Sequence, residues 1–176
     1  MRFEVLDLKH VSPYANGPSK EWIVKHYGDV FGNIFFNWCC QPDFKILNDA
    51  KPLLKSQPSD NPLVAKLNKL CYLAHEWRVQ RQWDNPLVVT DQKGNYIVHP
   101  GQDRYNIMRA FGVTSYNFCL IDLEESKDDI VAKLEKIFNN DGVIQFDQKH
   151  LTFRNYRVDP THYAKWIAQD ISIDCL

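Results

Sequence analysis

The chain has 176 residues, of which 44% are hydrophobic and 13% aromatic, and this predicts one domain that buries its own core. Its 21 basic and 22 acidic residues give a net charge of -1, which argues against a protein that coats nucleic acid or an anionic membrane by bulk charge. The five cysteines show no disulfide pattern, and the first residues lack the apolar run of a signal peptide, so we expect a reduced, cytoplasmic protein. We expect no membrane span, because no apolar segment is long enough. We expect most of these cysteines to be buried as small apolar side chains.

The N-terminal residues 1–48 predict a strand-helix-strand elaboration of the domain. A strand is expected from Phe3 to Leu6, a helix from Ser19 to Tyr27 and an aromatic strand from Ile34 to Cys39. Residues 49–61 are rich in proline, serine and aspartate, so we expect a linker without regular structure there. The aromatic side chains expected in the core of this part are Phe31, Phe35, Phe36 and Trp38.

The core of the domain is expected at residues 62–140. A long helix begins at Pro62 and ends near Arg81, because apolar residues recur on one of its faces. Two strands follow, around a hairpin turn at Gly94. These strands are expected at residues 87–90 and 96–98. A turn at Pro100 and Gly101 then opens a helix, which ends at Gly112.

The remaining residues predict further strands and helices. A strand is expected at residues 116–121, and Ser126 with Asp129 resembles a capping box at the start of the next helix. Residues 141–176 predict a hairpin and a last helix that begins at Asp159 and Pro160. The fold class is therefore expected to be α/β, of the α+β type.

The turn at Gly101 is the segment with the clearest chemical meaning. A glycine turn that leads into a helix leaves backbone N–H groups at the positive end of the helix dipole, which favours an anion. Arg104, in the first helical turn, can add a bidentate charged donor to the same phosphate. Spacing alone is also compatible with an ordinary strand-to-helix turn and a solvated arginine.

The forty residues from 86 to 125 resemble the core of the ParB/sulfiredoxin superfamily. In that superfamily a P-[IVL]-V-V strand, a hairpin, a G-x-x-R turn with its helix, and a further strand follow one another. The positions that match this pattern are Pro86, Leu87, Val88, Val89, Gly94, Tyr96, Ile97, Gly101, Arg104, Ala110, Gly112 and Val113. The resemblance implies a ParB-like domain in which helices flank a mixed sheet, with the segments before and after it as elaborations.

The resemblance also implies a ligand. In the superfamily the G-x-x-R turn grips the phosphates of a nucleotide, which is CTP, ATP or ADP in different branches, and other branches are nucleases. Gly101, Gln102 and Arg104 are thereby implied as contacts to a nucleoside triphosphate, with or without Mg²⁺. The middle positions of the turn depart from the pattern, since ParB clamps usually carry an acidic residue followed by a basic one where this chain has Gln102 and Asp103. The chain also lacks the reactive cysteine of sulfiredoxin at this turn, so sulfiredoxin chemistry is not expected.

Two further groups of residues carry weaker functional signals. His99 and Asp103 flank the turn and are candidate catalytic residues, with the ordinary end of a strand and start of a helix as the alternative. Cations alternate with aromatic side chains near the C-terminus, a pattern that suits single-stranded nucleic acid or a core hairpin and helix. The candidate nucleic-acid contacts there are Arg154, Arg157 and Lys165.

Two functions follow from these patterns. The first is a phosphate-recognising protein that binds a nucleotide or nucleic acid, with NTPase, kinase or nuclease activity if it is an enzyme. The second is a non-catalytic accessory protein of a virus or mobile element, which keeps the fold and binds a host protein or DNA. A homodimer is compatible with both, and neither involves a membrane.

Overall fold

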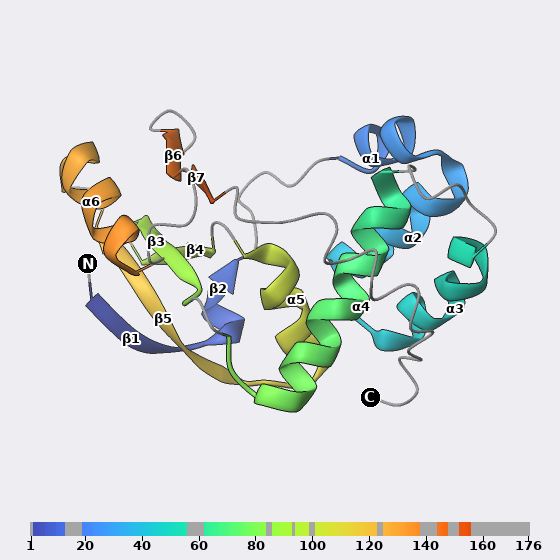
Figure 1. Cartoon of the computed structure of the whole chain (residues 1–176), viewed down its shortest axis with the longest axis horizontal. Coiled ribbons are helices and arrows are strands. Elements are labelled where there is room, and N and C mark those ends of the chain that lie inside the picture. The colour runs from blue at the N-terminus through green and yellow to red at the C-terminus, as the bar shows by residue number, and fades with distance from the viewer. Residues whose placement is uncertain are drawn as a thin grey trace. The chain divides into compact units, whose positions relative to one another are not determined.

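The computed structural model describes residues 2–12, 19–55, 62–83, 86–92, 94–98, 101–122, 125–137, 144–147 and 152–155 (Figure 1). These residues form an α+β protein, as expected, and they group into two compact units. The first unit holds all the described strands, the 3₁₀ turn η1 (Leu8–His10), the start of α5 and helix α6. The second unit holds α1 to α4 and the rest of α5. No helix in the described part of the chain is both long and apolar enough to cross a membrane.

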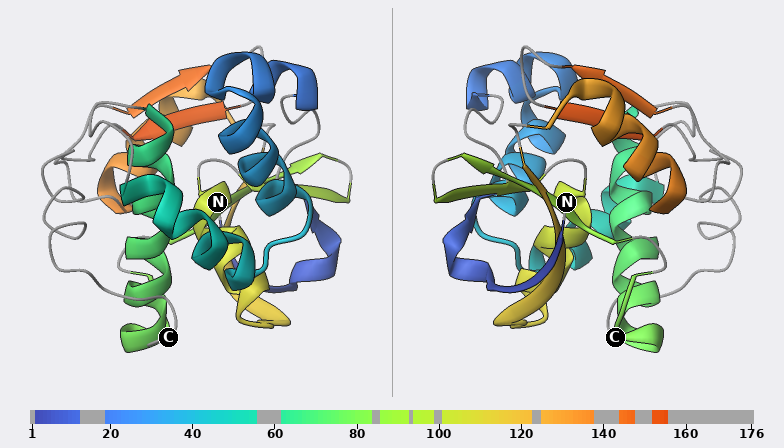
Figure 2. Two further views of the ribbon diagram at one scale, coloured as in Figure 1. Left: turned by 90° about the vertical axis from the view of Figure 1, so that its right-hand side faces the viewer. Right: turned by 90° about the vertical axis from the view of Figure 1, so that its left-hand side faces the viewer.

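The first unit is built on a five-stranded mixed sheet with the strand order β1-β5-β3-β4-β2. Strands β3 and β5 are parallel, β2 and β4 are parallel, and the other neighbouring pairs are antiparallel. Figure 2 shows β1 and β5 curving side by side. The five strands are β1 (Arg2–Asp7), β2 (Val11–Ser12), β3 (Val88–Gln92), β4 (Asn95–Val98) and β5 (Ser115–Asp122).

The sheet curls because its two edge strands are close neighbours in the chain. Strands β1 and β2 occupy opposite edges, yet only the three residues of η1 separate them. Edge strands of a flat five-stranded sheet lie roughly 19 Å apart, whereas four peptide steps span at most about 14 Å. The buried hydroxyl of Tyr105 lies 2.9 Å from the carbonyl oxygen of Leu8 and 2.6 Å from that of Val11, so it can donate to either side of this corner.

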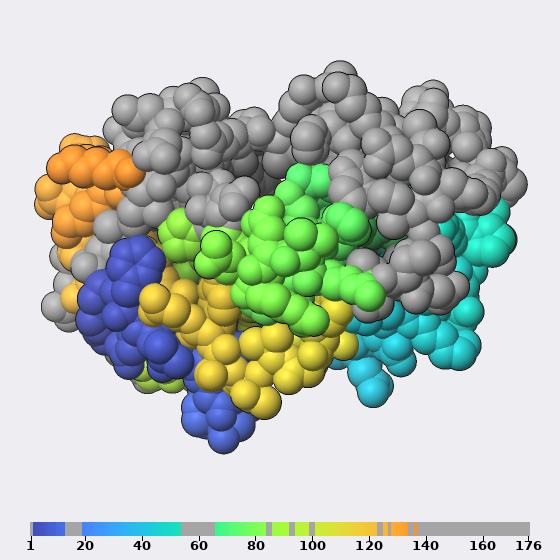
Figure 3. Space-filling model, turned by 60° about the horizontal axis from the view of Figure 1, so that its bottom comes forward, coloured from blue at the N-terminus to red at the C-terminus, as the bar shows by residue number. Residues whose placement is uncertain are grey.

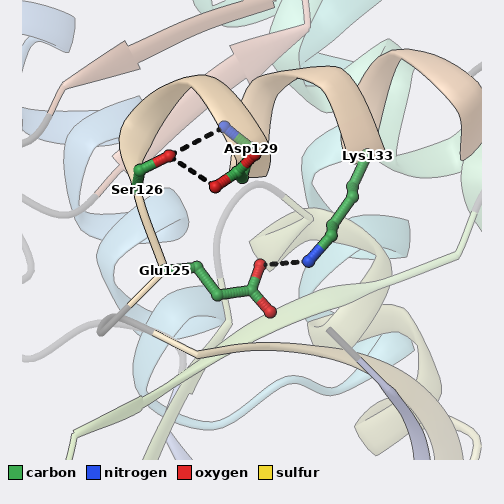
Figure 4. Close-up of polar contacts among 4 residues, drawn as sticks. All are labelled: Glu125, Ser126, Asp129 and Lys133. Atoms are coloured by element: carbon green, nitrogen blue, oxygen red, sulfur yellow. Dashed lines mark hydrogen bonds and ion pairs between the residues drawn. The ribbon is translucent and has the colours of Figure 1, made fainter.

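Local signals in the sequence explain most boundaries in this unit. The Asp91 carboxylate accepts a hydrogen bond from the Gly94 amide at 2.7 Å and closes the hairpin between β3 and β4. Figure 4 shows the start of α6 (Lys127–Ile137), where the Ser126 hydroxyl accepts from the Asp129 amide and donates to its carboxylate. This arrangement confirms the expected cap. The predicted C-terminal hairpin is also present, as the antiparallel pair β6 (Ile144–Asp147) and β7 (Thr152–Asn155).

The second unit is helical. It contains α1 (Lys20–Tyr27), α2 (Asp29–Cys40), α3 (Phe44–Lys55) and α4 (Pro62–Gln80). Helices α1 and α2 approach closely at Gly32, where an added Cβ would lie 2.7 Å from the Cα atom of Val24. The predicted helix at 19–27 and the long helix from Pro62 are confirmed.

Three predictions for the N-terminal part and the cysteines were wrong. The segment Ile34 to Cys39 is helical, because its buried side chains lie on one face of α2. The first half of the expected linker 49–61 is also helical, since α3 continues to Lys55 and buries Leu47 and Ala50. Of the four described cysteines, Cys119 alone is buried and Cys40 is exposed. The aromatic core is confirmed for Phe31, Phe35 and Trp38, whereas Phe36 is half-buried. The predicted last helix lies outside the described residues.

Candidate functional site

The site is built around the start of α5 (Gln102–Ala110). The first hydrogen bond of this helix runs from the Tyr105 amide to the Gly101 carbonyl oxygen at 2.8 Å. The amides of residues 102–104 therefore point out of the N-terminal end of the helix, where the helix dipole is positive. This is the local geometry that the sequence predicts for the turn.

Glycine is required at position 101 for two reasons. Its φ is +127°, a conformation that other residues rarely adopt. An added Cβ would also lie 2.3 Å from the Cδ2 atom of Leu87, a fully buried side chain at the entrance to β3. The backbone before α5 is thus packed directly against the hydrophobic core of the first unit.

The Arg104 guanidinium folds back over this glycine. Its Nη2 and Nε atoms lie 3.5 Å and 3.8 Å from the position that a Cβ at residue 101 would occupy. Its Cζ atom also lies 5.9 Å from the centroid of the Trp83 ring, within the range of a cation–π interaction. The positive charge of Arg104 is therefore held beside the backbone where α5 begins.

Tyr116 of β5 joins the same group of residues. Its hydroxyl oxygen accepts a hydrogen bond from the Trp83 backbone amide at 3.4 Å. Burial raises the pKa of Tyr116, and the bond from Trp83 and the charge of Arg104 oppose that rise. Arg104, Trp83 and Tyr116 thus form one electrostatically connected cluster.

The structure describes four of the five residues predicted at the turn. Gln102, Asp103 and Arg104 are half-buried in the first turn of α5, directly after Gly101. Asp103 places a carboxylate at the end of the helix where the dipole favours negative charge. His99 lies outside the described residues, so its proposed pairing with Asp103 stays a prediction.

Of the three predicted nucleic-acid contacts, the structure describes only Arg154. Arg154 belongs to β7, where it pairs with Gln145 of β6. Arg157 and Lys165 lie outside the described residues. These three positions therefore remain a prediction from sequence.

Sequence reasoning missed Trp83 and Tyr116 as parts of the site. They lie 33 residues apart in the chain and meet only in the folded protein, so no local spacing reveals them. Among the side chains that the structure describes, no group of three histidine, cysteine or acidic residues could hold a metal ion.

The fold and the site together define an α+β protein with a glycine-arginine turn at the start of a helix. Comparisons of the chain with family models, with curated proteins and with solved structures find no match.

Proposed function

We propose that the turn from Gly101 to Arg104 binds the phosphates of a nucleotide or of a nucleic-acid end. The observation that carries this proposal is the Arg104 guanidinium folded over Gly101, beside the outward-pointing amides of α5. Backbone amides at a helix start and a guanidinium are both donors that phosphate oxygens accept. One phosphate at this position can reach both kinds of donor.

The resemblance of residues 86–125 to the ParB/sulfiredoxin superfamily supports the same ligand. In those proteins the G-x-x-R turn contacts nucleotide phosphates, and Gly101 and Arg104 occupy the matching positions here. We therefore propose a ParB-like phosphate site that takes a nucleoside triphosphate. Asp103 is the carboxylate that the first turn offers to a Mg²⁺ ion bound with those phosphates.

If the protein is an enzyme, the site suits phosphoryl transfer or phosphodiester hydrolysis. Fixed N–H groups and an arginine stabilise the charge that develops on phosphoryl oxygens in the transition state. With Asp103 bound to Mg²⁺, His99 would accept the proton of the attacking group; without the metal, either Asp103 or His99 would do so. We propose the cytoplasm as the compartment, because an exposed free thiol such as Cys40 persists in reducing surroundings.

Calorimetric titration tests the proposal. The probes are ATP, CTP, ADP, pyrophosphate and a short single-stranded DNA, each with and without Mg²⁺. We expect at least one phosphate ligand to bind, and Arg104→Ala to weaken it by about ten- to a hundredfold, because charged hydrogen bonds are lost. Arg109→Ala is the matched control, since it removes an arginine from the last turn of the same helix. Failure of every probe to bind, or unchanged affinity in Arg104→Ala, would contradict the proposal.

A second candidate function is a non-catalytic interaction protein, and the exposed side chains of β1 favour it. Phe3 and Val5 are 55% and 67% exposed on this edge strand, which lies at the surface in Figure 3 (blue). Exposed apolar side chains on an edge strand are typical of a surface that pairs with a partner. If this is the function, Phe3→Ser with Val5→Ser abolishes capture of a partner from host extract, whereas Arg104→Ala does not.

A further inference from the structure

The guanidinium at the proposed phosphate site is held by an aromatic ring. Arg104 Cζ lies 5.9 Å from the centroid of Trp83, in the same compact unit. A guanidinium at this distance is attracted by the negative face of an indole ring. The contact restricts a long side chain that would otherwise adopt many rotamers.

Trp83 is in turn fixed to the sheet. Its backbone amide donates to the Tyr116 hydroxyl at 3.4 Å, and the Tyr116 ring meets Phe118 edge to face at a centroid distance of 5.5 Å. Phe118 is fully buried in β5. This hydrogen bond is long and therefore weak, so loss of the Tyr116 hydroxyl should disturb the arginine less than loss of the Trp83 ring.

The burial of Trp83 decides which role it can have. The residue is 8% exposed, so its ring is too well covered to serve as a stacking platform for a nucleobase. A side chain that touches the arginine and is covered from the solvent acts through the arginine. Its influence should therefore concern the phosphates of the ligand and be independent of the base.

We infer that Trp83 is a positioning residue for Arg104, with Tyr116 as its anchor, and that the pair holds the guanidinium in place before a phosphate arrives. This inference rests on the proposed phosphate-binding function. A preorganised arginine loses less conformational entropy on binding, so the affinity for phosphate is higher than with a mobile one.

Affinity measurements with Trp83→Leu and Tyr116→Phe test the inference. We expect Trp83→Leu to weaken the binding of ATP, CTP and pyrophosphate by the same factor, about two- to fivefold, which corresponds to the loss of a cation–π interaction with a half-buried arginine. Tyr116→Phe should weaken them by a smaller factor. Trp77→Leu is the matched control, because Trp77 is also buried, at 4% exposure, but belongs to the second unit. Weakening confined to nucleotides, or the same weakening in Trp77→Leu, would overturn the inference.

A second measurement does not depend on a ligand. In a double-mutant cycle of unfolding, Trp83→Leu and Arg104→Ala should be non-additive by about two- to fivefold in the unfolding equilibrium constant. Trp77→Leu with Arg104→Ala should be additive. Additive effects of Trp83→Leu and Arg104→Ala overturn the inference. Failure of every probe to bind the unmodified protein contradicts the proposed function, whereas binding that is lost in Arg104→Ala and kept in Trp83→Leu contradicts only the inference.

Discussion

Replacing Gly101 with alanine tests how the turn before α5 is built. At a φ of +127° a residue with a side chain is strained, at a cost of about 1 to 3 kcal/mol. The added Cβ also meets Leu87 Cδ2 at 2.3 Å, and overpacking of this kind costs about 1 to 3 kcal/mol. We therefore expect Gly101→Ala to lower the free energy of unfolding by about 2 to 6 kcal/mol, a large share of the stability of a domain.

Urea unfolding followed by far-UV circular dichroism measures this loss. Gly112→Ala is the matched control, because Gly112 has a φ of +71° and an added Cβ there would meet nothing within 4 Å. It should cost about 1 to 2 kcal/mol. Leu87→Val removes the atom that clashes, so combining it with Gly101→Ala should cost less than the sum of the two single changes. Equal losses at the two glycines, or an additive double variant, would refute the close packing of Gly101 on Leu87.

Three further predictions concern residues outside the phosphate turn. Arg81 has a φ of +58° at the end of α4, so Arg81→Gly should be more stable to urea than Arg81→Ala by about 1 kcal/mol; equal stability would contradict this. Tyr105→Phe should lower the free energy of unfolding by about 1 to 2 kcal/mol, because the buried hydroxyl bonds to the corner between β1 and β2; an unchanged urea midpoint would argue against that bond. Loss of hydration raises the pKa of the half-buried Cys71 and of the buried Cys119 to about 11, so the exposed Cys40 should react first with a thiol-specific disulfide reagent. The same thiols ionise near pH 9.0 in the unfolded chain but stay protonated to about pH 11 in the folded one, so the urea midpoint should fall between these two pH values. The fall should be smaller in Cys119→Ala. Faster labelling of Cys119 than of Cys40, or an equal fall in the variant, would contradict this.

The parts of the fold that are predictable from sequence are those with a local cause. The sequence predicts the start of α6 from Ser126 and Asp129, the hairpin from Gly94 and the start of α5 from Gly101. These features are predictable because capping and positive φ involve only neighbouring residues. The same reasoning places Arg104 at the candidate site. Its guanidinium position beside Gly101 is consistent with that placement.

The wrong secondary-structure predictions fall in segments whose structure is determined by tertiary packing. The aromatic run from Ile34 to Cys39 has high strand propensity, but Phe31, Phe35 and Trp38 are spaced for one face of a helix, and burial of that face determines α2. Pro52 suggests a break, yet it lies inside α3. A side-chain cap on the Lys45 amide from Asp43 starts this helix, and burial of apolar residues on α3 offsets the missing hydrogen bond.

The residues that contact Arg104 at the site cannot be predicted from the local sequence. Trp83 contacts Arg104 only because the entrance to β3 and the start of α5 lie together in the first unit. The curled sheet, with β1 and β2 at opposite edges, has no signature in either strand alone. Contacts of this kind follow from strand order, which depends on residues far apart in the chain.

The central claim is that phosphate binds where α5 begins, and amide chemical shifts test it most directly. In a ¹⁵N-¹H titration with ATP and with pyrophosphate, we predict saturable shifts that are largest at the amides of residues 101–104 and strongly reduced in Arg104→Ala. The amides of β1 and β2 should hardly change. Shifts that are absent at residues 101–104, or that are as large in Arg104→Ala as in the unmodified protein, would contradict the claim.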